Sequence, residues 1–233
     1  MFATQNGNLE IVKLLLNNHA PVDLTSFDGG TALHCCCQVN DRTEIINCLL
    51  EHGANTNLQI SDGATPLFMC SQNSNIDISK ILIKFGANVN LCRNDQCSPL
   101  WIATQFGHAD MVAFLIQNGS EVDAARKDGS TPLFKAAAAG DCVIAQILLN
   151  ANASVLLLKN GHTALMAAVN YGHMDMVKLL CDYGSDPNML NLHGFRCIHF
   201  SEYNGHDEIS RYLHIRAKYV IKCQSSHLNV PND

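Results

Sequence analysis

Apolar residues recur along this chain at intervals of three and four positions, in short groups separated by polar stretches that contain glycine. The clearest groups are Ile45, Leu49 and Leu50, and then Ile144, Leu148 and Leu149. This spacing places the apolar side chains on one face of a helix. The pattern therefore predicts short amphipathic helices, each of which needs a neighbour to cover its apolar face.

One apolar position also returns at a nearly constant interval. It is occupied by Leu33, Leu67, Leu100, Leu133, Leu165 and Ile198, at steps of 34, 33, 33, 32 and 33 residues. A period near 33 residues is typical of a stacked array, in which each small unit packs only against its neighbours. The sequence therefore predicts an array rather than a globule with one central core.

Each unit begins with residues suited to a tight turn and then to a helix start. Glycine adopts the positive φ that such turns need, and the turn dipeptides are Asp28-Gly29, Asp62-Gly63, Asp128-Gly129, Asn160-Gly161 and His193-Gly194. Asp95-Gln96 lacks the glycine, which predicts a turn that is either strained or rebuilt. A hydroxyl that can cap the next helix follows at Thr31, Thr65, Ser98, Thr131 and Thr163, whereas Arg196 breaks this pattern.

Small residues mark the places where helices of adjacent units must approach closely. Three residues after the repeated leucine position, the occupants are Ala3, Cys36, Cys70, Ala103, Ala136, Ala168 and Ser201. Cysteine serves there as a small hydrophobic residue. Four residues further on, a glycine is placed to end the first helix of the unit, at Gly107, Gly140, Gly172 and Gly205.

With -D-G-x-T-P-L- opening the unit and -L-L-x-x-G-A-x-x-N- closing it, the chain resembles the ankyrin repeat over about residues 2–216. The resemblance implies an all-α solenoid of helix-turn-helix pairs joined by β-hairpin loops. It divides the chain into a truncated repeat at 1–27, repeats at 28–61, 62–94, 95–127, 128–159 and 160–192, a capping repeat at 193–216 and a tail at 217–233. The truncated repeat indicates a shortened cap or a fragment of a longer ankyrin protein, and we favour the fragment.

Composition and charge bear on three questions: nucleic-acid binding, membrane insertion and cellular location. The chain has 233 residues, 47% of them hydrophobic, with a formal net charge of -6, which is typical of a folded protein and gives no cationic patch for nucleic acid. The most apolar stretch, residues 133–149, is interrupted by Lys135 and Asp141, so we expect no membrane insertion. No signal peptide is visible, and the scattered cysteines then indicate reduced thiols in the cytoplasm or the nucleus.

The many histidines and cysteines raise the question of a metal site. The resemblance implies structural roles for five histidines, namely His34, His108, His173, His199 and His206. Successive residues of a helix point about 100° apart, so Cys35, Cys36 and Cys37 cannot all bind one zinc ion. A metal site or disulfide at Cys92 and Cys97 stays a minor alternative. Because no catalytic motif occurs, we expect no enzyme activity, no cofactor and no metal.

Surface positions that the repeat does not dictate are the candidate binding site. On the expected concave side, the residues just before the helix-ending glycines include Phe106, Tyr171 and Tyr203. Exposed aromatic residues often dominate protein-binding surfaces. Trp101 replaces the usual histidine after Leu100, and it belongs either to this surface or to the core beneath the next hairpin.

The hairpin tips are the second candidate surface. A positive edge on this acidic chain is formed by Arg93, Arg126, Lys127 and Lys159. It predicts an acidic partner segment, and ordinary solvated tips are the alternative. In the run Val155-Leu156-Leu157-Leu158, strand alternation cannot point every leucine inward, so Leu157 is a further candidate contact.

The resemblance also implies a modification. Asn57, Asn90 and Asn188 occupy the hairpin position that an oxygen-dependent asparaginyl hydroxylase can β-hydroxylate in family members. The match is one of position alone.

The function that the resemblance implies is a monomeric, non-enzymatic scaffold. It would bind a partner protein through its concave face and its hairpin tips. The alternative is the ankyrin-repeat portion of a larger protein, such as a channel, a ligase adaptor or an enzyme.

Overall fold

The computed structural model describes residues 1–39, 42–156 and 161–216. It divides into two compact units, Met1–Lys127 and Asp128–Asp233. The first unit contains α1 Phe2–Gln5, α2 Leu9–Asn17, α3 Ala32–Cys37, α4 Thr43–Glu51, α5 Pro66–Gln72, α6 Ile76–Lys84, α7 Pro99–Gln105 and α8 Ala109–Gln117. The described part of the second unit contains α9 Pro132–Ala139, α10 Cys142–Asn150, α11 Ala164–Asn170, α12 Met174–Asp182, α13 Cys197–Tyr203 and a further helical segment over residues 207–216.

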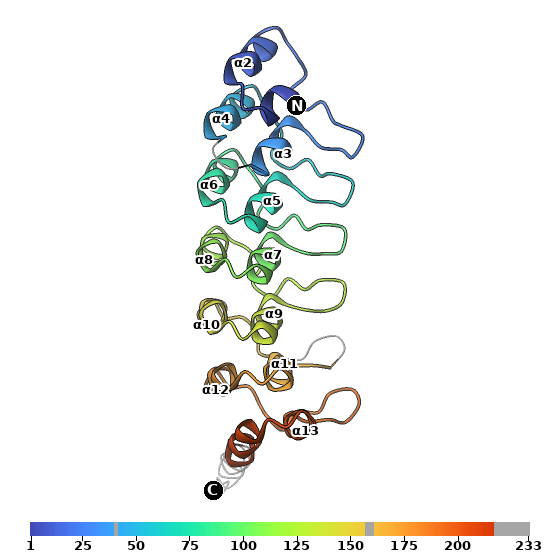
Figure 1. Cartoon of the computed structure of the whole chain (residues 1–233), viewed down its shortest axis with the longest axis vertical. Coiled ribbons are helices and arrows are strands. Elements are labelled where there is room, and N and C mark those ends of the chain that lie inside the picture. Colours follow the sequence, from blue (N-terminus) through green and yellow to red (C-terminus); the bar gives the residue numbers. More distant parts are fainter. Residues whose placement is uncertain (40–41, 157–160, 217–233) are drawn as a thin grey trace, which may run out of the picture. The chain divides into compact units, whose positions relative to one another are not determined.

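Within each unit the helices form two layers. In the first unit α3, α5 and α7 lie beside the projecting loops, and α4, α6 and α8 lie behind them (Figure 1). The second unit repeats this arrangement, with α9, α11 and α13 beside the loops and α10 and α12 behind (Figure 1). Equivalent helices of adjacent repeats pack together, most extensively α5 with α7 and α9 with α11. The predicted all-α array of helical pairs is confirmed.

The loops between repeats are hairpin-shaped turns. Their backbone hydrogen bonds include the Ile60 N–H to the Ala64 carbonyl at 3.0 Å and the Arg93 N–H to the Cys97 carbonyl at 2.9 Å. No residue of the described ranges is assigned to a strand. The loops therefore hold their shape through turn bonds of this kind rather than through a continuous sheet.

The helix starts follow the predicted capping pattern. The Thr65 hydroxyl accepts from the Phe68 N–H at 3.1 Å, and the equivalent hydroxyls cap α3, α7, α9 and α11. Proline occupies the first turn of α5, α7 and α9, where its missing N–H leaves no bond unmade. Arg196 offers no side-chain acceptor, and its own N–H instead donates to His199 Nδ1 at 2.9 Å. The sequence thus predicted both the caps and the exception.

Of the strained and the rebuilt turn that the sequence left open at Asp95-Gln96, the strained one is present. Gln96 has φ 63°, in the left-handed region that the glycines of the other turns occupy without strain. The backbone therefore keeps the same turn although the residue that favours it is missing.

The core lies between helices of adjacent repeats. Leu33, Leu67, Leu100, Leu133 and Leu165 are all buried, as are the small residues that follow each of them in the next helical turn. Those small residues include Cys36 and Cys70. Burial raises the pKa of the Cys36 thiol to about 12, so it stays protonated at neutral pH and packs as an apolar side chain.

The first repeat differs from the others on one face. Ile11 and Leu15 of α2 are about half exposed, at 46% and 48%, although the residues at the same positions of α4, α6, α8, α10 and α12 are buried. With Phe2 they line a shallow hollow beside α1. In the part of the chain that the structure describes, no helix combines the length and the apolar character needed to cross a membrane.

Candidate protein-binding surface

Three exposed aromatic residues lie where the first helix of a repeat ends. Phe106 follows α7, Tyr171 follows α11, and Tyr203 is the last residue of α13. Their side chains are 48%, 61% and 91% exposed. Since core packing does not hold them, they are available to other molecules, as the sequence led us to expect. We call these three residues the helix-end aromatics.

Histidine rings order two of the helix-end aromatics. The ring of Phe106 stacks on His108 with centroids 6.1 Å apart, and Tyr171 stacks on His173 at 6.3 Å. His173 Nε2 lies 3.1 Å from the Ala138 carbonyl oxygen, and a carbonyl only accepts, so Nε2 carries the proton. The imidazoles thus join adjacent repeats and give each aromatic ring a fixed platform.

Tyr171 and Tyr203 flank a second hydrogen-bonded junction between repeats. The Asn204 amide donates to the carbonyl and side-chain oxygens of Asn170 at 3.2 and 3.1 Å, and His206 Nε2 lies 3.3 Å from the same carbonyl. Asn170 immediately precedes Tyr171, and Asn204 immediately follows Tyr203. The backbones that carry the two tyrosines are therefore fixed relative to each other.

Trp101 does not belong to this surface. It is only 3% exposed and packs with Ala64, Phe68, Cys97 and Ile102. The large ring fills the space beneath the hairpin, where burial of its apolar area is favourable. Of the two interpretations that the sequence left open, core filler is the correct one.

The positive edge expected at the hairpin tips is partly neutralised, because Arg93 and Arg126 share the one carboxylate of Asp95. Arg93 contacts both carboxylate oxygens of Asp95, at 2.8 and 3.1 Å, and Arg126 Nη2 lies 2.9 Å from Asp95 Oδ2. The two guanidinium groups also cover buried rings, Arg126 at 4.6 Å from the centroid of Trp101 and Arg93 at 5.5 Å from that of Phe68. Cation–π and ionic contacts thus hold both arginine side chains in the fold. Their contact with a partner stays a prediction.

Asp95 also bonds the backbone of its own turn and of the next hairpin, as Asp62 does at the equivalent tip. Its side chain accepts from the Cys97 N–H at 3.1 Å, and its carbonyl accepts from the Lys127 N–H at 3.0 Å. Hydrogen bonds from Arg93, and then from the Cys97 N–H and Arg126, hold the pKa of the Asp95 carboxyl well below its ordinary value of 3.8. The charged carboxylate thus helps to stabilise the strained turn at Gln96.

Asp95→Asn is expected to lower the free energy of unfolding of the first unit by about 1 kcal/mol at neutral pH, as for a partly exposed ion pair. Because the folded pKa of Asp95 is depressed, its contribution is present above pH 3.8 and is lost as the pH falls below that value. Urea unfolding between neutral and strongly acidic pH should therefore show the variant and the wild type converging. Asp62→Asn, at the equivalent tip but outside any ion pair of the described residues, is the control. Curves that stay parallel would contradict the assignment.

The remaining tip candidates have different outcomes. Lys127 is exposed. Leu157 and Lys159 lie outside the described residues, although Leu156, just before them, is exposed. Lys127 is therefore the tip candidate whose charge the structure leaves in solvent.

The asparagines proposed for hydroxylation make hairpin contacts. The Asn57 amide donates to the Gly86 carbonyl at 2.9 Å, and its oxygen accepts from the Asn88 N–H at 2.8 Å. Asn90 bonds the Gly119 carbonyl and the Glu121 N–H in the same way. For Asn188 the bond is a local one, from its N–H to the Asp186 side chain at 2.8 Å. Hydroxylation of these side chains stays a prediction.

The sequence reasoning missed exposed apolar residues in the last hairpin. Leu190 and Leu192 are more than half exposed, and Phe195 is 49% exposed. Their signal was present, because the equivalent residues of the preceding hairpins are mostly small or polar. Phe27, at the first hairpin tip, is fully exposed and was missed in the same way.

The positions of the described histidines and cysteines bear on two questions, a metal site and a reactive thiol. Within residues 1–39, 42–156 and 161–216, no three His, Cys, Asp or Glu side chains come together as a metal site would require. Cys92 and Cys97 both carry free thiols. Burial raises the pKa of the Cys97 thiol to about 12, which leaves it unreactive at neutral pH.

Comparison with known proteins agrees with the array of helical pairs. A family model described as "Ankyrin repeats (3 copies)" matches residues 1–91, 82–159 and 136–223. The chain is 43% identical over 82 residues to the ankyrin repeat protein FPV031 of Fowlpox virus (strain NVSL), which is 34% of this chain and 24% of that protein. It is 41% identical over 59 residues to Notch-regulated ankyrin repeat-containing protein B of Danio rerio, which is 25% of this chain and 53% of that protein.

A third relative is ankyrin repeat domain-containing protein 53 of Mus musculus, 38% identical over 76 residues, which is 31% of this chain and 15% of that protein. The chain thus spans between 15% and 53% of the length of these three relatives.

Proposed function

This chain belongs to the ankyrin repeat family, and from that premise we propose that it is a scaffold that binds a partner protein through its helix-end aromatics. The family is in general a non-enzymatic, protein-binding fold. We further propose a location in the cytoplasm or the nucleus, where its free thiols would stay reduced.

The observation that carries the proposal is the exposure of Tyr171 and Tyr203 on ordered supports. Both side chains are more than half exposed, yet hydrogen bonds between repeats fix the backbones that present them. A rigid aromatic side chain loses little conformational entropy on binding, which favours it as a major contributor to affinity. Core stability does not require an aromatic at either position. Asn73 and Ala139 occupy the position of Tyr171 in other repeats, and Gln105 and Ala138 occupy that of Tyr203.

The hairpin tips of the first unit are a second, weaker candidate contact. Two arginines share one carboxylate at Asp95, and Lys127 is exposed beside them. This local excess of positive charge supports the proposal that an acidic partner segment contacts the first unit. The contribution to affinity should be small and salt-dependent, because these charges are near solvent.

The test is affinity capture with wild type and with the variant Phe106→Ala/Tyr171→Ala/Tyr203→Ala. We expect the variant to fold normally and to recover its partners at least about tenfold less efficiently, which corresponds to about 1.4 kcal/mol. Identical partners in identical amounts would overturn the proposal.

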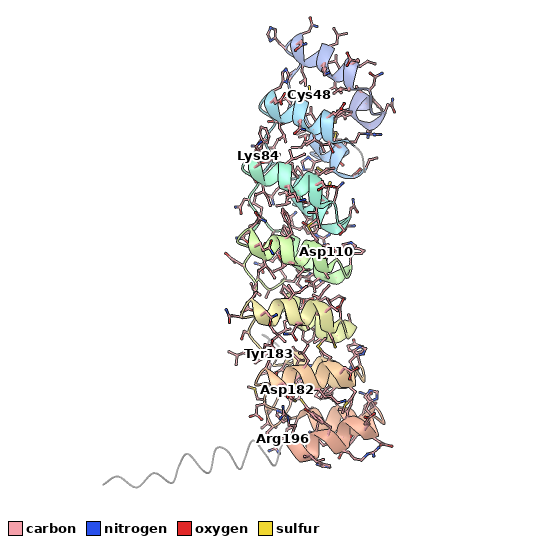
Figure 2. All side chains as sticks on the ribbon, turned by 90° about the vertical axis from the view of Figure 1, so that its left-hand side faces the viewer. Cys48, Lys84, Asp110, Asp182, Tyr183 and Arg196 are labelled. Carbon is pink, nitrogen blue, oxygen red and sulfur yellow. The ribbon has the colours of Figure 1, made fainter. Side chains whose placement is uncertain are left out.

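The control removes aromatic residues from the other layer of helices. Phe85 and Tyr183 follow α6 and α12 and are each 41% exposed. Figure 2 views the molecule from this side and shows Tyr183 beside Asp182. Phe85→Ala/Tyr183→Ala should leave capture unchanged, so a loss with this variant too would mean that general surface hydrophobicity, not the helix-end aromatics, drives binding.

A further inference from the structure

The last repeat of the described chain carries a line of aromatic side chains from its hairpin to its helix end. The ring of Phe195 lies 6.2 Å from that of Phe200, and Phe200 lies 5.7 Å from the ring of His162 in the preceding repeat. Phe200 and Tyr203 are three positions apart on α13, so they share one face of that helix. We call Phe195, Phe200, Tyr203 and the adjacent Tyr171 the aromatic strip.

The aromatic strip is not explained by packing. Phe195 is 49% exposed, and its position is occupied by His162 in the preceding repeat and by Gly30, Ala64, Cys97 and Ser130 in the others. A small residue is therefore sufficient for the hairpin to fold. Phe200 is only partly buried. Contiguous exposed apolar area of this kind, on a rigid element, is typical of a contact site.

The two ends of the aromatic strip differ in charge. Beside Tyr203, Glu202, Asp207 and Glu208 are exposed, and within residues 161–216 none of the three takes part in an ion pair. Arg211 lies on the same helical segment, and its Nε donates to the backbone carbonyl of Asp207 at 3.2 Å.

At the other end, Phe195 is followed by the exposed Arg196, and the apolar Leu190 and Leu192 precede it. A cationic ligand group is thus attracted to the Tyr203 end and repelled from the Phe195 end. An apolar group suits the Phe195 end.

We propose that the aromatic strip binds an extended peptide segment of a partner protein, with an apolar residue at Phe195 and an arginine or lysine between Tyr171 and Tyr203. The inference rests on the proposed scaffold function and names the chemistry of its partner. The cation gains from the faces of the two tyrosine rings and from the nearby carboxylates.

The length of the strip sets the spacing within that segment. The seven residues of α13 rise roughly 10 Å at 1.5 Å per residue. An extended chain covers this distance in about three residues. The apolar residue and the cation should therefore be about three positions apart.

The experiment selects ligands from a phage-displayed library of random linear peptides on the folded full chain. We expect enrichment of peptides with arginine or lysine about three positions from an apolar residue. A synthetic copy of an enriched peptide, followed by fluorescence anisotropy, should bind Tyr171→Ala/Tyr203→Ala about tenfold more weakly than wild type. It should bind Glu202→Gln/Asp207→Asn roughly threefold more weakly and with less dependence on salt.

Tyr183→Ala, which removes an exposed tyrosine from the other layer of helices, should leave the affinity unchanged. Enriched peptides that are acidic or uncharged, or that bind every variant equally, would overturn the inference, as would a selection that yields no binding peptide. Neutral peptides that still lose affinity with Tyr171→Ala/Tyr203→Ala would overturn only the partner chemistry and leave the scaffold proposal standing. Equal melting temperatures of the variants would show that each one is folded.

Discussion

Replacing Leu133 by aspartate is expected to abolish cooperative folding of the second unit at 25 °C. Leu133 is fully buried in α9, which packs against both α10 and α11. Removing such a side chain alone costs about 2–5 kcal/mol, and a carboxylate left in an apolar site adds several kcal/mol more. The total is comparable with the roughly 5–15 kcal/mol that stabilises a typical domain. In an array, the loss of one repeat also removes the surface that covers its neighbour.

Far-UV circular dichroism during urea unfolding measures this effect. Leu133→Ala should be intermediate, with a clear transition shifted to lower urea. His193→Ala, at an exposed hairpin tip of the same unit, should change the free energy of unfolding by no more than about 0.5 kcal/mol. Equal shifts for Leu133→Asp and His193→Ala would contradict the assignment of the repeated leucine position to the core.

The repeated features of the fold could be read from the sequence because each one satisfies a local requirement. Thr65, Thr131 and Thr163 were assigned as caps on residue type and position alone, and each accepts from the N–H three residues further on. The same local logic placed Cys36 in the core, where only a small side chain fits. Such positions recur from repeat to repeat, so several copies of the pattern support the same structural assignment.

The surface was harder to predict because exposure depends on what another repeat places above a residue. Trp101 and Phe106 are five positions apart, and both are aromatic residues at variable positions of the repeat. The next hairpin and the guanidinium of Arg126 cover Trp101, whereas Phe106 lies beyond their reach. No periodicity in the sequence distinguishes these two cases.

The ion pairs between hairpins could not be predicted from the sequence for the same reason. Arg93 and Arg126 lie 33 residues apart in the sequence and looked like two free cations on separate tips. They meet at Asp95 because the repeat period brings equivalent hairpin residues together. The missing glycine at Gln96 was the available signal, since a strained turn needs an additional stabilising contact.

Gly140→Val is expected to destabilise the second unit by about 3 kcal/mol and to weaken partner binding as well. Gly140 ends α9 with φ 72°, a conformation that costs a non-glycine residue roughly 1–2 kcal/mol and a β-branched residue more. A Cβ atom at this position would lie 2.7 Å from His173 Nδ1 and 2.8 Å from its Cγ. The ring must then move, which breaks its bond to the Ala138 carbonyl at a cost of about 1 kcal/mol.

Gly205→Val is the matched control because its backbone is nearly the same, with φ 71°, and a Cβ there would meet no atom within 4 Å. Urea unfolding should show a smaller loss for Gly205→Val, and the difference between the two variants isolates the clash with His173. The displaced imidazole is also the platform on which Tyr171 stacks. Partner binding by Gly140→Val should therefore fall under conditions where the variant is still folded. If the two valine variants lose equal stability, the imidazole does not hold the repeats together, and the order of Tyr171 must come from the Asn170–Asn204 junction alone.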